Sequence, residues 1–166
     1  MMLRLSELVG RNVVSQDAGA TVGEVADVLV DGTGVVGIVL AGSVFGSERV
    51  LPFSAVAMFG EDTLIATTGT AIVDAKQWGK SGVTAQRLSG LRKKQILTAA
   101  GQMLGVVGDV YVETTGAVAG YDVENRGLGG LVKHHKILPA EGVVVGTNAL
   151  VVSEEAASAF TAKGER

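Results

Sequence analysis

VGEVADVLVD, at residues 22–31, is an aliphatic run that carries an aspartate in its interior. The pattern returns as LGVVGDVYVE at residues 104–113. The glycine, the internal aspartate and the closing carboxylate all recur 82 residues later, from positions 23, 27 and 31 to positions 105, 109 and 113. Runs rich in valine are typical of β-strands. The recurrence therefore predicts two copies of one β-structure in this chain.

Shorter matches surround this strand in both halves. RLSEL at residues 4–8 returns as RLSGL at 87–91, and a Leu-Pro pair at 51–52 returns at 138–139. The offset between the copies grows after the long strand, which places the main insertion at 124–136, and we expect that insertion to be a loop. Each copy contains about six short strands, and pairing the first with the last would close the sheet and remove its edges.

The predicted fold class is therefore all-β, with two tandem small β-barrels and a short C-terminal helix. The first unit covers residues 1–70 and the second covers 87–153. A linker is expected at 71–86, and a short helix with a frayed tail at 154–166, where Ser153 and two early glutamates favour a helix start. Trp78, the single tryptophan, is expected to pack the linker onto a barrel; the alternative is an exposed anchor for a partner.

The start of the first unit reads as a short turn. Ser6 is expected to cap this turn by accepting a backbone N–H, and Gly10 is expected to end it with a positive φ.

Composition sets further bounds. The chain has 166 residues, 47% of them hydrophobic, and no cysteine. The absence of cysteine excludes disulfides and thiolate chemistry and suits a reducing compartment, so we expect a cytoplasmic protein. No apolar run approaches the roughly 20 residues that span a bilayer, and no membrane insertion is expected.

Charge is distributed unevenly along the chain. The net charge is −3, with −4 on residues 1–80 and +1 on residues 81–166. A weakly acidic protein without aromatic residues among its basic clusters is a weak candidate for nucleic-acid binding. The basic clusters of the second half are candidate partner-binding residues, with a merely solvated surface as the alternative. The candidates are Arg92, Lys93, Lys94, Arg126, Lys133, His134, His135 and Lys136.

Asp27 and Asp109 are carboxylates inside apolar strands. A buried carboxylate needs hydrogen bonds or a counter-charge, so we expect each to accept turn N–H groups or to pair with an arginine, Arg4 or Arg87. A catalytic pair would need a cleft and shifted pKa values, which the sequence does not indicate. Structural roles are assigned to residues that recur in both copies. They are Asp27, Asp109, Gly23, Gly105, Pro52 and Pro139.

No metal or cofactor site is indicated. His134 and His135 are adjacent, and neighbours in a strand point to opposite faces, so they make a poor chelating pair. The glycines of residues 127–130 lack the spacing of a phosphate-binding loop.

The ordered signs are Arg-Leu-Ser-x-Leu, a short strand, Gly-x-Val-x-Asp-Val-x-Val-Asp, an aliphatic strand, Leu-Pro and a last strand. This order resembles the PRC-barrel family, which is similar to the cytoplasmic domain of the photosynthetic reaction-centre H subunit and to the C-terminal domain of a ribosome maturation factor. The resemblance is closer over residues 3–69 than over 87–152. It implies small barrels that bind macromolecules and carry no catalytic residues.

The sequence thus predicts a non-catalytic adaptor or scaffold with a protein partner. The alternatives are an RNA- or ribosome-assembly-associated factor and, from another class, a hydrolase with a novel site. Partner identity and oligomeric state are left open.

Overall fold

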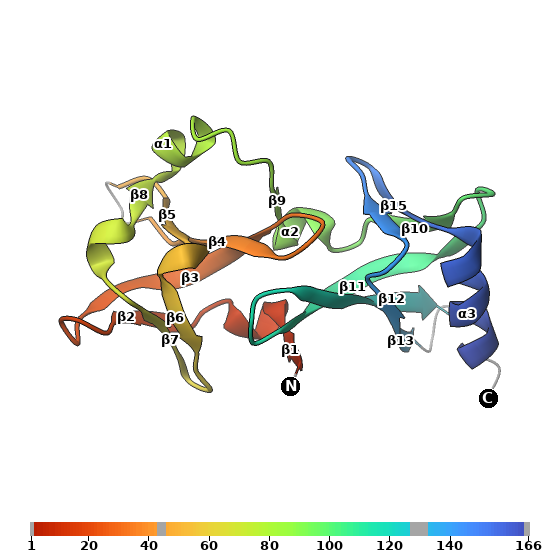
Figure 1. Ribbon diagram of the computed structural model, residues 1–166, viewed down its shortest axis with the longest axis horizontal. Helices are drawn as coiled ribbons and strands as arrows, with labels where there is room; N and C mark the ends of the chain where they lie inside the picture. The colour runs from red at the N-terminus through yellow and green to blue at the C-terminus, as the bar shows by residue number, and fades with distance from the viewer. Residues whose placement is uncertain (1, 43–45, 127–132, 165–166) are drawn as a thin grey trace.

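Two strongly bent sheets lie side by side in the computed structural model, each built mainly from one half of the chain (Figure 1). The structure describes residues 2–42, 46–126 and 133–164, except for the side chains of residues 126, 133–135 and 162–164. No helix in these ranges is long and apolar enough to cross a bilayer.

The first sheet follows the order β6-β7-β2-β3-β4-β5-β8. Its members are β2 (Asn12–Ser15), β3 (Thr21–Val30), β4 (Val35–Leu40), β5 (Arg49–Pro52), β6 (Val56–Phe59), β7 (Thr63–Ala66) and β8 (Val73–Asp74). The 3₁₀ turn η2 (Phe53–Ala55) joins β5 to β6, and η3 (Gly69–Ala71) precedes β8.

The second sheet follows the order β13-β12-β11-β10-β15-β14. Its members are β10 (Gln95–Thr98), β11 (Met103–Glu113), β12 (Val118–Arg126), β13 (Lys133–Pro139), β14 (Val143–Val145) and β15 (Ala149–Val152). The helix α3 (Glu154–Gly164) follows β15.

The two sheets share one topology and one register. The first strand of each copy pairs in parallel with the last, β2 with β7 and β10 with β15. Pro52 lies opposite Gly37, and Pro139 lies opposite Gly120, so the Leu-Pro pair has the same place in both sheets. The prediction of two tandem small β-barrels with a short C-terminal helix is confirmed.

Alternation along the long strands creates the core. Val25, Val28 and Val30 of β3 are buried against the inner side chains of β4, β5 and β7. A β-bulge breaks the alternation of β3 between Val25 and Asp27, and β11 has the same irregularity between Val107 and Asp109. A bulge re-aims one side chain, and here that side chain is the aspartate.

The segments after the last strands differ between the two halves. In the segment predicted as a linker, β8 pairs with β5, and α1 (Ala75–Gly79) follows. Trp78 is half-buried against the cluster of Leu29, Val39 and Val50, which confirms that it packs this segment onto the first barrel. In the second half α3 follows β15, and the Oγ of Ser153 accepts the N–H of Ala156 at 3.2 Å.

The prediction of a loop at 124–136 was wrong for residues 124–126 and 133–136, which belong to strands, whereas residues 127–132 lie outside the described residues. Within the described residues β12 and β13 form a long antiparallel hairpin whose register extends to Arg126 opposite Lys133. Backbone groups pair in a hairpin whether or not the side chains are apolar, so a polar insertion can lengthen both strands. Sequence reasoning also missed the short strands β6 and β14, which follow turns and contain few residues.

Candidate partner-binding site

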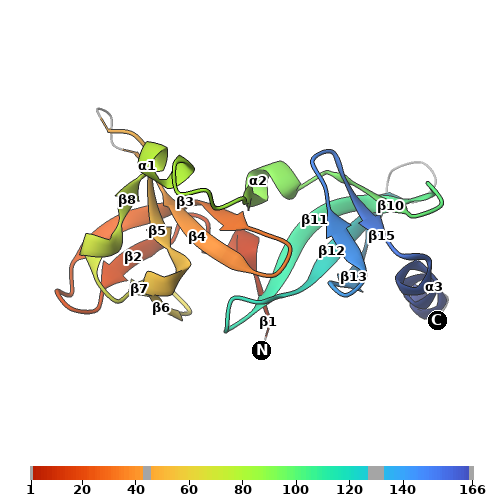
Figure 2. The same cartoon turned by 45° about the horizontal axis from the view of Figure 1, so that its top comes forward.

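The leading strand of each half belongs to the sheet of the other half. β1 (Met2–Arg4) pairs with β11 of the second sheet, where Leu3 lies opposite Val112. β9 (Gln86–Arg87) pairs with β3 of the first sheet, where Arg87 lies opposite Leu29. The two halves are thus joined by a reciprocal strand exchange. Figures 1 and 2 show β1 below β11, and Figure 1 shows β9 leading down into α2, between the two sheets.

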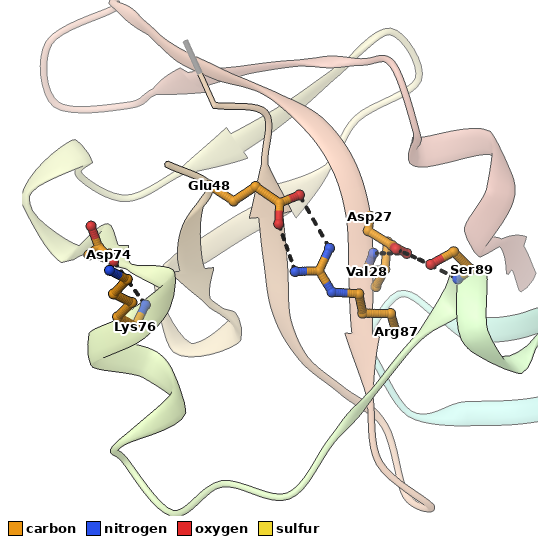
Figure 3. A network of polar contacts seen from close by, with 7 residues as sticks. All are labelled: Asp27, Val28, Glu48, Asp74, Lys76, Arg87 and Ser89. Atoms are coloured by element: carbon orange, nitrogen blue, oxygen red, sulfur yellow. Dashed lines mark hydrogen bonds and ion pairs between the residues drawn. The ribbon is translucent and has the colours of Figure 1, made fainter. Parts of the chain in front are cut away.

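A serine–aspartate contact follows each exchanged strand. Ser89 lies in the first turn of the helix α2 (Leu88–Leu91) and donates its backbone N–H, at 3.2 Å, and its hydroxyl to the Asp27 carboxylate (Figure 3). Ser6, in the 3₁₀ turn η1 (Leu5–Leu8), makes the same two contacts with Asp109. We call these two contacts the crossed latch.

The crossed latch satisfies the buried carboxylates. Asp27 and Asp109 are each 5% exposed, and each also accepts the N–H of the next residue, Val28 or Val110, at 2.9 Å. With donors on both carboxylate oxygens, the charge can remain buried. Turn N–H groups were expected here, but no feature within either copy indicated that they come from the opposite half.

Other expectations for the exchanged segments need correction. Ser6 makes no side-chain capping bond within η1, because its hydroxyl serves Asp109. Arg4 pairs with Glu7 at 3.3 Å rather than with a buried aspartate. Gly10 ends the turn with φ +92°, as predicted.

Arg87 binds Glu48 through two nitrogens, at 2.8 and 3.2 Å (Figure 3). The hydrogen bond from Arg87 lowers the pKa of Glu48, and the hydrogen bond to Glu48 raises the pKa of Arg87. Both side chains are about two-fifths exposed, so this pair contributes little to stability.

Two of the predicted basic residues meet at a cavity of about 530 Å³ beside the start of β11, which we call the cationic cavity. Its lining residues are Arg92, Lys93, Met103, Gly105, Val106, Val107, Gly108, Glu124 and Asn125. Arg92 donates from Nε to the Gly108 carbonyl at 2.9 Å, which fixes the guanidinium at the rim.

Lys93 has an unusual backbone. Its φ of +73° is the only positive φ among the described non-glycine residues. The first half has Gly10 at this position, and both residues donate their N–H to the equivalent strand carbonyl, Val25 or Val107. The copies therefore share a left-handed turn, which glycine adopts freely and lysine adopts only with strain.

Two other basic candidates, Lys94 and Lys136, do not line this cavity. Lys94 donates from Nζ to the Gln86 side chain and to the Gly146 carbonyl, so it ties the exchanged strand β9 to the second barrel. Lys136 was expected to be solvated; instead its ammonium group donates to the Phe160 carbonyl and lies 4.1 Å from the centre of that ring. Arg126, Lys133, His134 and His135 lie in the β12–β13 hairpin, but their side chains fall outside the described residues.

A family model for the PRC-barrel domain matches the chain twice, over residues 1–73 and 84–157. The chain belongs to the PRC-barrel domain family. No curated protein matches the sequence. The second match begins just before the exchanged strand β9, so each PRC-barrel unit includes a leading strand that completes its neighbour.

The second PRC-barrel unit also contains a buried carboxylate that sequence reasoning missed. Asp122 is 6% exposed and lies opposite Asp109 in the register, at the place where the first unit has Val39 opposite Asp27. Aligning AGY at 119–121 with VGI at 36–38 would have found this replacement. A Cβ atom on Gly108 would lie 2.4 Å from the Asp122 carboxylate, so this carboxylate requires a glycine beside it.

The structural glycines and the rest of the described surface complete the comparison. A Cβ on Gly23 would already lie 3.0 Å from the Leu40 side chain, and one on Gly105 would lie 2.7 Å from the Glu124 carbonyl. Among the described residues no group of three or more histidine or carboxylate side chains is placed to hold a metal ion.

Proposed function

We propose that this PRC-barrel protein is a non-catalytic adaptor whose cationic cavity binds an acidic segment of a partner protein. The observation that carries the proposal is the conformation of Lys93. A non-glycine residue with a left-handed backbone costs on the order of 1 kcal/mol, and the first unit avoids this cost with Gly10. Because Lys93 carries this cost at a position where glycine would be unstrained, its conformation supports a role for its side chain.

The chemistry of the cavity favours a carboxylate-rich ligand. Arg92 and Lys93 are both exposed at its rim, while the strand backbone around Gly105 and Gly108 and the exposed Met103 provide the remaining surface. Glu124 also lines the cavity and would repel a ligand carboxylate placed beside it. An acidic group is therefore expected to contact the Arg92–Lys93 side of the cavity.

A protein partner is favoured over RNA by the lining of the cavity. Among the described residues no aromatic ring lines it, whereas single-stranded RNA is usually bound by stacking its bases on aromatic side chains. The net charge of −3 also gives no long-range attraction to a polyanion such as RNA.

Affinity capture from cell extract tests this proposal. The double variant Arg92→Glu with Lys93→Glu should lose the captured protein, and its residual binding should depend less on salt. The matched control is Lys76→Glu with Lys80→Glu, which reverses two exposed charges on the first unit. Equal recovery by all three proteins, or capture of RNA alone, would refute the proposed function.

A further inference from the structure

The outer edges of β5 and β13 occupy the same place in the two units but differ in what covers them. In the first unit β8 pairs along β5, with Val73 opposite Val50 and Asp74 opposite Arg49. In the second unit β13 is the terminal strand of its sheet, and no described strand pairs along its outer edge. The pairing of β8 with β5 in the first unit is therefore a template for a peptide that pairs with β13 in the second unit.

Burial shows the consequence for the equivalent side chains. Val50 is 2% exposed, because Val73 and Trp78 pack over its cluster. Ile137, its counterpart one residue before the Leu-Pro pair, is 41% exposed. The same edge position is thus covered in one unit and open in the other.

A groove of about 350 Å³ lies between β13 and α3, and Ile137 forms part of it. The helix stands beside the end of β13 (Figure 1), and its groove-facing residues include the small side chains of Ala156 and Ala159. Pro139, Gly142 and Phe160 also line the groove. An apolar strand edge facing a wall of small residues is suited to an added strand.

We infer that the β13–α3 groove binds an extended peptide of another protein, which adds to β13 as β8 adds to β5. The peptide runs antiparallel to β13 and places a β-branched aliphatic residue over Ile137, as Val73 lies over Val50. This inference does not depend on the cationic cavity.

Charges at the two ends of the groove define the peptide further. The residue after the aliphatic one lies opposite Lys136, at the register position that Asp74 has opposite Arg49. The Lys136 ammonium group donates to the Phe160 carbonyl and has two further N–H donors, so a carboxylate is favoured there. Glu141 and Glu155 line the opposite end, beyond Pro139, so a basic residue is favoured two or three positions before the aliphatic one. The favoured ligand is a strand with the order basic, aliphatic, acidic.

The chain supplies its own probe. A synthetic peptide with the sequence of residues 69–80, carrying Thr70→Arg, has a basic residue, Val73 and Asp74 at the required spacing. Titrated into the isotope-labelled full chain, it should shift the amide resonances of residues 136–138 and 156–160. Ile137→Glu should weaken binding about tenfold or more, since losing a buried aliphatic contact costs roughly 1.5–3 kcal/mol.

Two controls keep the test specific. Val144→Glu changes a 67% exposed valine on the edge strand β14 and should leave binding unchanged. Two further peptides are N-methylated, one at the Val73 position and the other at the Asp74 position. Neighbouring N–H groups of a strand point to opposite sides, so only one of them can bond to β13. One of the two methylated peptides should therefore lose binding, and the other should bind as the parent peptide does.

Absence of resonance shifts at millimolar peptide, or equal binding by the Ile137 and Val144 variants, would overturn the inference. So would sedimentation showing that a second copy of the chain occupies this edge. Lys93→Gly should bind the peptide normally, which separates this test from that of the proposed function.

Discussion

The crossed latch makes a prediction about energetic coupling that a pair of self-contained barrels would not make. Asp27→Ala removes the acceptor of three hydrogen bonds, two from Ser89 and one from Val28. Leaving the buried Val28 N–H without its partner costs about 1–3 kcal/mol, and each lost charged hydrogen bond adds roughly 1.5 kcal/mol, partly offset because no carboxylate is buried any more. We expect a net loss of about 2–4 kcal/mol. Asp27→Asn should cost less, because the amide keeps one acceptor oxygen.

A double-mutant cycle shows which serine supports which aspartate. Asp27→Ala combined with Ser89→Ala should give a coupling energy of about 1 kcal/mol or more, because the two residues share a hydrogen bond. Asp27→Ala combined with Ser6→Ala should be additive within about 0.5 kcal/mol, since Ser6 contacts Asp109 instead. Urea unfolding measures all of these free energies. Coupling of Asp27 to Ser6 rather than to Ser89 would refute the strand exchange.

Three further predictions concern other contacts. Gly116→Ala should destabilise the protein by about 2 kcal/mol or more, because the φ of Gly116 is +86° and a Cβ there would lie 2.3 Å from the Phe53 ring. An unchanged midpoint of urea unfolding would contradict this contact. Lys136→Met should cost about 1 kcal/mol by losing the Phe160 carbonyl bond and ring contact, and a variant as stable as wild type would show that the ammonium group is solvated. Burial raises the pKa of Tyr121 to about 12, so the stability that its neutral hydroxyl contributes is complete below pH 10 and is lost as pH rises toward 12. The free energy of unfolding of Tyr121→Phe should lack this part of the decline at high pH. Identical pH profiles of unfolding for the variant and wild type would contradict this expectation.

Much of the fold could be predicted from the sequence, because the aliphatic strands and their 82-residue recurrence are local patterns. The bounds of β2 and β4 and the helix start after Ser153 follow from alternation and capping alone. The strand exchange could not be predicted in this way. RLSEL and RLSGL would read the same way whether each segment served its own barrel or the neighbouring one, and only the tertiary arrangement decides between the two.

The candidate site was predictable only in part, for a similar reason. A cluster of basic letters does not show where each ammonium group points: Lys93 lines the cationic cavity, while the adjacent Lys94 holds Gln86 and Gly146. The left-handed backbone of Lys93 was detectable from its alignment with Gly10, which has a positive φ in the same turn. Asp122 does not belong to the recurring pattern, because it replaces Val39 of the first unit, so the repeat gave no signal for it.

The single substitution Lys93→Gly tests the central claim most directly, because it separates the binding role of this residue from a structural one. The variant should be more stable than wild type by roughly 0.5–1 kcal/mol in urea unfolding, since glycine adopts the left-handed turn without strain. It should also bind the partner captured by the wild-type protein more weakly and with a shallower salt dependence, measured by titration at two ionic strengths. A variant that binds the partner as tightly as wild type at both ionic strengths would contradict the proposed function.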